Sequence, residues 1–119
     1  MRILIFAICA VGLIATCAGA HPTLTSATPA AGVSAASSPT ELRLTFSEDV
    51  VPRFSRVTLK DQGGKTIATG PATTEPKDKK QLVVLLKAPL TAGSYTVEWH
   101  AVSEDTHAVK GQYSFKVGP

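Results

Sequence analysis

Three segments of the chain alternate between apolar and polar residues, and this pattern limits the possible folds more than any other feature. The clearest case is 40–47, where Leu42, Leu44 and Phe46 occupy every second position. The same period recurs in 95–100 and 113–117. Because successive side chains of a strand point to opposite faces, each segment is predicted to be a β-strand with one buried face.

Other segments add shorter strand signals separated by turns. A hairpin turn is predicted at 61–64, because Gly63 and Gly64 can readily adopt the positive φ that such turns need. A loop is expected over 29–39, and no convincing helix follows residue 20. The sequence predicts an all-β fold of seven antiparallel strands, a sandwich or Greek-key β-barrel with Trp99, Tyr113 and Phe115 as core anchors. The seven predicted strands are 23–28, 40–47, 56–60, 65–69, 81–86, 95–102 and 113–117.

Residues 1–20 have the features of a cleaved secretory signal peptide. Arg2 is followed by an apolar run to Cys17 and then by Ala-Gly-Ala, a small-x-small cleavage pattern. The run is shorter than the roughly 20 residues of a membrane-spanning helix. A transmembrane anchor and lipid attachment at Cys17 are the alternatives. Cleavage after Ala20 would leave a single domain, residues 21–119.

Removal of the signal would also remove every sulfur atom. Met1, Cys9 and Cys17 are the only methionine and cysteines, so the domain would contain no disulfide and could bind a metal only through nitrogen and oxygen. The net charge of +3 falls to +2 without Arg2. Lys77, Lys79 and Lys80 are interspersed with acids, as in a solvated turn, so nucleic acid is not an expected partner.

Cleavage would make His21 the first residue of the domain. A terminal histidine offers two nitrogen donors, its α-amine and its ring Nδ1, which can chelate one metal ion. Pro22 has no N–H, so the next peptide nitrogen cannot become a competing ligand, and it biases His21 toward an extended conformation. The alternative is a flexible tail that happens to begin with histidine.

Asp105 and His107 form a second candidate pair, in the predicted connection 103–111. Residues i and i+2 of an extended chain point to the same side, so a carboxylate and an imidazole can converge there. A surface ion pair or a turn cap is the simpler interpretation. Glu98 and His100 have the same spacing, but they fall on the expected solvent face and fit a surface pair better. His100 is the alternative metal ligand if His107 does not bind.

Motifs of the common hydrolases and nucleotide-binding enzymes are absent from the sequence. There is no Gly-x-Ser-x-Gly, no His-Glu-x-x-His and no P-loop. Ser103 and His107 could be imagined as nucleophile and base, but Ser103 fits a turn residue better. The sequence therefore predicts a protein that is not an enzyme.

With the His21-Pro22 start and the Asp-x-His motif in view, residues 21–119 resemble the CopC family of bacterial copper-resistance proteins. The similarity runs through HPTLTSATPAAG, LRLTFSEDV, PLTAGSYTVEWHAVSEDTHAVKG and YSFKV, in the family's order and at similar spacing. The resemblance implies a seven-stranded Greek-key β-barrel of the Ig-like or cupredoxin-like kind, located in the periplasm. His100 stands where family members often have arginine.

The resemblance also implies a metal site. One Cu(II) ion would be bound by His21, through its amine and ring, by Asp105 and by His107. Some members bind Cu(I) through a methionine-rich loop, which this chain lacks. The expected function is a periplasmic Cu(II) carrier or buffer in copper homeostasis or resistance, with a CopD-type inner-membrane transporter as a partner and no membrane span after signal cleavage. The alternatives are a copper oxygenase with a terminal histidine and a β-sandwich interaction module that binds no metal.

Overall fold

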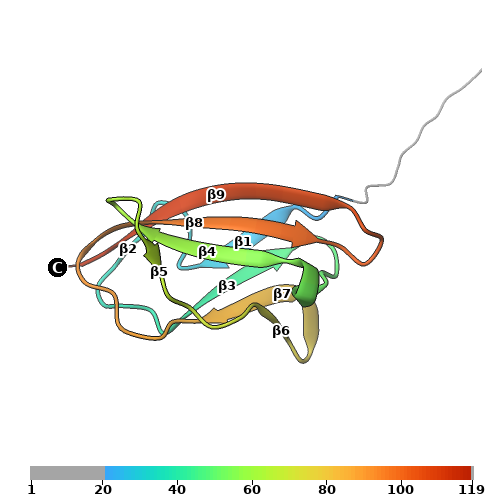
Figure 1. Cartoon of the computed structure of the whole chain (residues 1–119), viewed down its shortest axis with the longest axis horizontal. Coiled ribbons are helices and arrows are strands. Elements are labelled where there is room, and N and C mark those ends of the chain that lie inside the picture. Colours follow the sequence, from blue (N-terminus) through green and yellow to red (C-terminus); the bar gives the residue numbers. More distant parts are fainter. Residues whose placement is uncertain (1–20, 119) are drawn as a thin grey trace, which may run out of the picture.

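The computed structural model describes residues 21–118, so the predicted signal peptide, 1–20, lies outside the described residues (Figure 1). The described part contains β-strands, one short 3₁₀ helix and no α-helix. None of its helices is long and apolar enough to span a lipid bilayer. The elements are β1 (Leu24–Thr28), β2 (Ser34–Ala35), β3 (Glu41–Phe46), η1 (Pro52–Phe54), β4 (Arg56–Asp61), β5 (Thr66–Ile67), β6 (Thr73–Glu75), β7 (Asp78–Leu85), β8 (Gly93–Val102) and β9 (Ala108–Val117).

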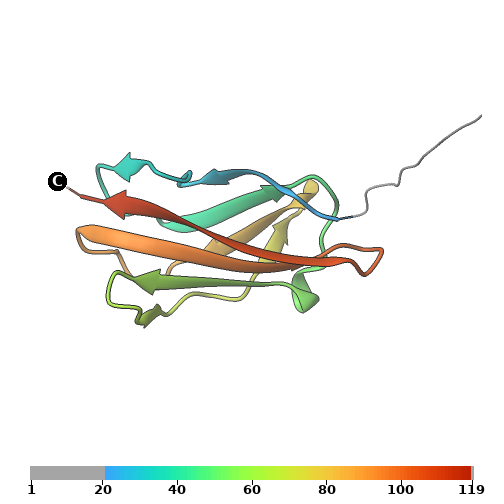
Figure 2. The same ribbon diagram turned by 90° about the horizontal axis from the view of Figure 1, so that it is seen from above.

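The strands form two packed sheets. One sheet has the order β1-β3-β7-β6, and the other has the order β2-β9-β8-β4-β5. Figure 2 shows β8 and β9 crossing the molecule as its two longest strands. The predicted all-β sandwich is confirmed. The two sheets remain separate and do not close into a barrel.

All seven predicted strands are present, but their bounds differ and two short strands were missed. β2 lies inside the predicted loop 29–39 and pairs in parallel with the end of β9. β6 forms an antiparallel pair with β7, and the turn between them is only 76–77, so Lys79 and Lys80 of the predicted solvated turn belong to β7 instead. Strands of two or three residues are too short to show a period, so they are determined by the backbone of a neighbouring strand.

The last strand also begins earlier than predicted. β9 starts at Ala108, so the connection that carries the candidate ligands is only 103–107 rather than 103–111. Val102 pairs with Ala108, and the antiparallel register then continues to Gly93 and Val117. β8 and β9 thus form a long hairpin with a five-residue connection. The two candidate ligands lie at its tip.

The alternating segments supply the core between the sheets. Leu42, Leu44 and Phe46 of β3 are fully buried, as is Phe115 of β9. Trp99 and Tyr113 are only partly buried and pack against the edge of this cluster. The Trp99 ring lies 6.4 Å from Phe46 and 6.1 Å from Tyr113, measured between ring centroids. Of the three predicted anchors, Phe115 is central and the other two are peripheral.

Candidate metal centre

The start of the described chain is held firmly against the domain. Pro22 is among the fully buried side chains, although only one residue separates it from the predicted cleavage point. The Thr23 N–H donates to Ser47 Oγ at 2.9 Å, and the Ser47 N–H donates to the Thr23 carbonyl at 2.8 Å. His21 itself is exposed. It is therefore an exposed residue on an anchored segment, which argues against a flexible tail.

The second candidate pair lies on the tight connection between β8 and β9. The Ser103 N–H donates to the His107 carbonyl and the Thr106 N–H donates to the Ser103 carbonyl, both at 2.9 Å. Ser103 is buried, and its backbone forms an isolated β-bridge with Val50. These bonds fix the connection to the body of the sandwich.

Thr106, between the two candidate ligands, has a left-handed backbone conformation. Its φ is +72°, and it is the one non-glycine residue with a positive φ in the part of the chain that the structure describes. This region is unfavourable for a β-branched residue and costs of the order of 1 kcal/mol or more. Such strain is concentrated at functional sites in proteins, because the surrounding structure must maintain it.

The structure brings the three predicted residues together at one end of the molecule. The rings of His21 and His107 lie 5.0 Å apart between centroids, with an interplanar angle of 61°. His107 Nδ1 lies 3.3 Å from Asp105 Oδ1. Figures 1 and 2 both place the start of the described chain and the β8–β9 connection at this end. Both contacts involve His107, which is central to the cluster.

The spacing of the two rings is compatible with a shared ion. Two imidazoles bound to one ion through bonds of about 2 Å have centroids roughly 4 to 6 Å apart. Within residues 21–118, however, no three His, Cys, Asp or Glu side chains converge closely enough to form a metal site on their own. A site here would need small side-chain movements and a further donor.

Ser103 positions Asp105, a role that the sequence did not reveal. Its hydroxyl donates to Asp105 Oδ1, and this bond is the main reason that the pKa of Asp105 is lowered. Burial opposes the shift, while hydrogen bonds from His107 add to it. Serine and aspartate are both common in turns, so their presence two residues apart was the available signal. Asp105 is consequently held as a carboxylate over a wider pH range.

More carboxylates surround the cluster than the sequence suggested. An open hollow of about 350 Å³ is lined by Glu48, Asp49, Glu104 and Asp105, together with Lys80 and Ser103. The Glu104 N–H donates to the Asp49 carbonyl at 3.3 Å, which brings the two acidic segments together. Glu48 and Asp49 lie just after β3 and are far from Glu104 and Asp105 in the sequence. In the fold they create a negative potential that attracts cations.

The alternative pair, Glu98 and His100, lies apart from the cluster of His21, Asp105 and His107. Glu98 Oε2 lies 3.3 Å from Lys60 Nζ, so the partner of Glu98 is a lysine of β4. His100 pairs across the sheet with Arg56 on one side and Lys110 on the other. The expected surface pairing of Glu98 is therefore present, with a different partner. His100 belongs to a different surface.

Known proteins resemble this chain over most of its length. The model of the CopC domain matches residues 24–118. Protein YobA of Escherichia coli strain K12 is 40% identical over 111 residues, which cover 93% of this chain and 90% of that protein. Copper resistance protein C of Pseudomonas syringae pv. tomato is 40% identical over 110 residues, which cover 88% and 86% of the two chains.

A solved structure agrees with these sequence relatives. The crystal structure of CopC from Methylosinus trichosporium OB3b superimposes with a TM-score of 0.78 at 32% sequence identity. The match covers 83% of this chain and 95% of that chain. Fold, family model and sequence similarity all agree, and the chain belongs to the CopC domain family.

Proposed function

We propose that this protein binds one Cu(II) ion as its cargo through His21, Asp105 and His107, and that it serves as a periplasmic copper carrier or buffer. Family membership supports copper as the metal, because relatives of this chain are named for copper resistance. The observation that carries the proposal is the 5.0 Å separation of the His21 and His107 rings. These residues come from opposite ends of the described chain, and the fold alone brings them together.

The donor set fits Cu(II) better than other common metals. An amine, two imidazoles and a carboxylate suit a tetragonal ion, and Cu(II) has the highest affinity of the first-row divalent metals for such donors. Zn(II) would bind more weakly. Residues 21–119 contain no thiol or thioether, the donors that favour Cu(I). Reduction would therefore promote release of the metal.

The fourth donor depends on removal of residues 1–20. In the full chain the nitrogen of His21 belongs to a peptide bond and cannot coordinate as an amine. Cleavage after Ala20 would free it beside the His21 ring, while the buried Pro22 keeps both near the β8–β9 connection. The amine would add a fourth donor to three side chains that, within residues 21–118, do not converge closely enough to hold a metal by themselves. We further propose that this cleavage follows export to the periplasm.

Copper transfer to a CopD-type inner-membrane partner and a role without catalysis complete the proposal. Copper competes with protons for the amine and for both imidazole rings. Affinity should therefore fall as the pH drops below neutrality. The protein would hold its metal best at neutral or higher pH.

Titration of the processed protein with Cu(II), followed by visible and paramagnetic resonance spectra, tests the site. We expect one ion per chain. His21→Ala should lose about 100-fold or more in copper affinity, because it removes the ring nitrogen that forms the chelate with the amine. One additional glycine before His21 should weaken binding comparably. His100→Ala is the matched control, because His100 lies outside the cluster, and it should bind copper normally. Equal affinity of the glycine-extended and processed forms would refute the chelate.

A further inference from the structure

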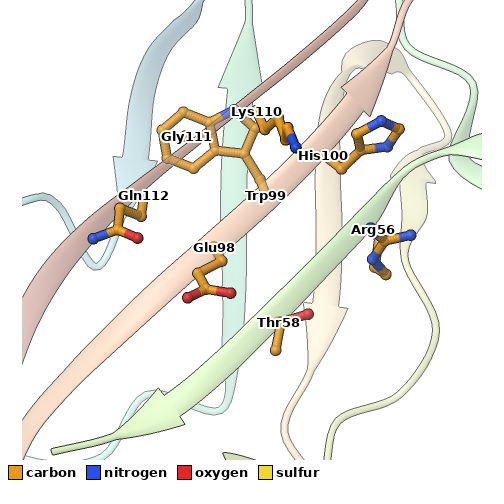
Figure 3. A pocket seen from close by; sticks show the side chains of 8 residues that line it. All are labelled: Arg56, Thr58, Glu98, Trp99, His100, Lys110, Gly111 and Gln112. Atoms are coloured by element: carbon orange, nitrogen blue, oxygen red, sulfur yellow. The ribbon is translucent and has the colours of Figure 1, made fainter. Parts of the chain in front are cut away.

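The outer face of the five-stranded sheet carries a row of three nitrogen-bearing side chains, which we call the cationic row: Arg56, His100 and Lys110. Arg56 lies directly opposite His100, and His100 lies directly opposite Lys110. Adjacent strands are about 4.8 Å apart, so the row extends over roughly 10 Å. Figure 3 shows these residues on β4, β8 and β9. Three neighbouring strands thus each contribute one member.

The positive charge of this row is not balanced within the domain. The nearest acidic residue along β8, Glu98, is paired with Lys60 at 3.3 Å. Among residues 21–118, neither Arg56 nor Lys110 has a carboxylate within ion-pair distance. Arg56 and Lys110 lie on either side of His100, two strands apart. The row therefore presents two positive charges that have no salt-bridge partner in the described chain.

His100 adds a second unsatisfied feature. Its Nδ1 is shielded from solvent and has no hydrogen-bond partner within the described chain. Buried polar atoms are nearly always paired, so an unpaired one calls for an explanation. The row also lines an open hollow of about 520 Å³, together with Thr58, Glu98 and Gln112. A concave surface with two unpaired cationic side chains, Arg56 and Lys110, is suited to binding an anionic ligand.

An exposed aromatic residue, Phe54, lies close to Arg56 of the row in the sequence. Phe54 of η1 is 56% exposed, and the Arg53 guanidinium lies 4.8 Å from the centroid of its ring. Phe54 comes two residues before Arg56, and η1 contacts β8. Exposed aromatic residues and arginines are enriched in protein interfaces. The 3₁₀ helix η1 thus adds an exposed aromatic residue and an arginine, which are typical of protein interfaces, next to a strand of the row.

We infer that the cationic row is a docking surface for an extended acidic segment of a partner protein. Carboxylates two residues apart on an extended segment point to the same side and lie about 6.6 Å apart. Two or three of them can span the row, with one carboxylate for Arg56 and another for Lys110. The outward-facing neighbours Thr58, Gln112 and Ser114 are polar, which disfavours a lipid surface.

This inference goes beyond the proposed function, and it does not require copper at His21. The row lies near the end of the hairpin that carries Asp105 and His107, because His100 and Lys110 are the third pair from the β8–β9 connection. A bound partner would therefore lie close to the candidate metal centre. Electrostatic complementarity of this kind mainly increases the rate and the selectivity of association.

Nuclear magnetic resonance titration of the metal-free processed protein with an octaglutamate peptide tests the inference. We expect amide shifts concentrated around positions 56–58, 98–100 and 110–112, and weaker binding as salt is added. The double variant Arg56→Gln/Lys110→Gln should lose about tenfold or more in affinity. The matched control Lys65→Gln/Lys116→Gln removes the same amount of charge elsewhere on the domain, and Lys116 lies on the same strand as Lys110. It should bind within about twofold of the unchanged protein.

The amide spectrum of each variant establishes that it is folded. Equal weakening by the two double variants would show that only net charge matters, and it would overturn the inference. Sulfate that binds as tightly as the peptide would also overturn it, as would stronger binding to phosphatidylglycerol vesicles. Shifts at the row that appear on concentrating the protein alone would identify a second copy as the occupant and would likewise overturn it. Because no copper is present, failure here leaves the proposed copper site untouched.

Discussion

The carboxyl group of Asp105 owes its low pKa mainly to one hydroxyl group, that of Ser103. The hydrogen bond stabilises the charged form, and His107 contributes less. A carboxyl group whose pKa is lower in the folded state stabilises the fold above its unfolded pKa, near 3.8. That stabilisation is lost as the pH falls through the folded value. In the metal-free protein the loss of this stabilisation is therefore confined to acidic solutions.

Ser103→Ala should raise the pKa of Asp105 toward 3.8 in the metal-free protein, because the hydroxyl donor is removed. The hydrogen bond from the backbone N–H of residue 103 to the His107 carbonyl remains and preserves the connection. Carbon-13 titration of the carboxyl groups measures this directly. Ser114→Ala, on the outer face of β9, serves as the control and should leave the Asp105 pKa unchanged. An Asp105 pKa that stays low in Ser103→Ala would mean that His107 alone holds the carboxylate.

At the scale of elements, the β8–β9 hairpin depends on a close contact between Trp99 and Gly111. These residues lie opposite each other in the register, and the indole ring covers the glycine. A Cβ atom at position 111 would lie 2.5 Å from Trp99 Cζ2, closer than atoms can approach. Trp99 cannot easily move away, because it also packs against Phe46 and Tyr113.

Gly111→Ala should therefore lower the free energy of unfolding by about 1–3 kcal/mol, the usual cost of overpacking. Denaturant unfolding measures this change. Trp99, the sole tryptophan, should report the displaced ring through altered fluorescence. Gly70→Ala is a suitable control, because the added carbon would make only ordinary contacts with Leu85. Similar stabilities of the two variants would mean that the indole has room to move.

At the scale of the whole molecule, the candidate metal centre lies between the two sheets. His21 precedes β1, which belongs to the four-stranded sheet, whereas Asp105 and His107 connect two strands of the five-stranded sheet. A bound ion would therefore link the sheets at one end of the sandwich. Such a link exists only in the folded state, so binding should stabilise the fold.

Cu(II) should raise the melting temperature of the processed protein. Free copper at 100 times its dissociation constant contributes about 2.7 kcal/mol. For a domain of this size that corresponds to roughly 10 °C or more. Calorimetry with and without copper measures the shift, and a chelator should reverse it. If the glycine-extended form were stabilised equally, copper would have to bind somewhere other than the chelate at His21.

Much of the fold could be predicted from local pattern. The alternation in β3, β8 and β9 defines one buried face for each strand, because hydrophobic burial acts on every second residue. Strands β2 and β6 were not predictable in this way, since their partners determine them. Whether the sheets close into a barrel was also undetermined, because closure depends on the pairing of edge strands, which no local pattern encodes.

The sequence by itself determined the chemistry available to this protein. It supplies a histidine at a predicted cleavage point, an aspartate and a histidine two residues apart, and no sulfur in residues 21–119. Only the tertiary structure decided which of these groups meet. The buried Pro22 and the tight β8–β9 connection place His21 beside His107, whereas His100 joins Arg56 and Lys110 on another face. Side-chain chemistry is a property of single residues, but proximity between distant residues arises from the packing of the whole chain.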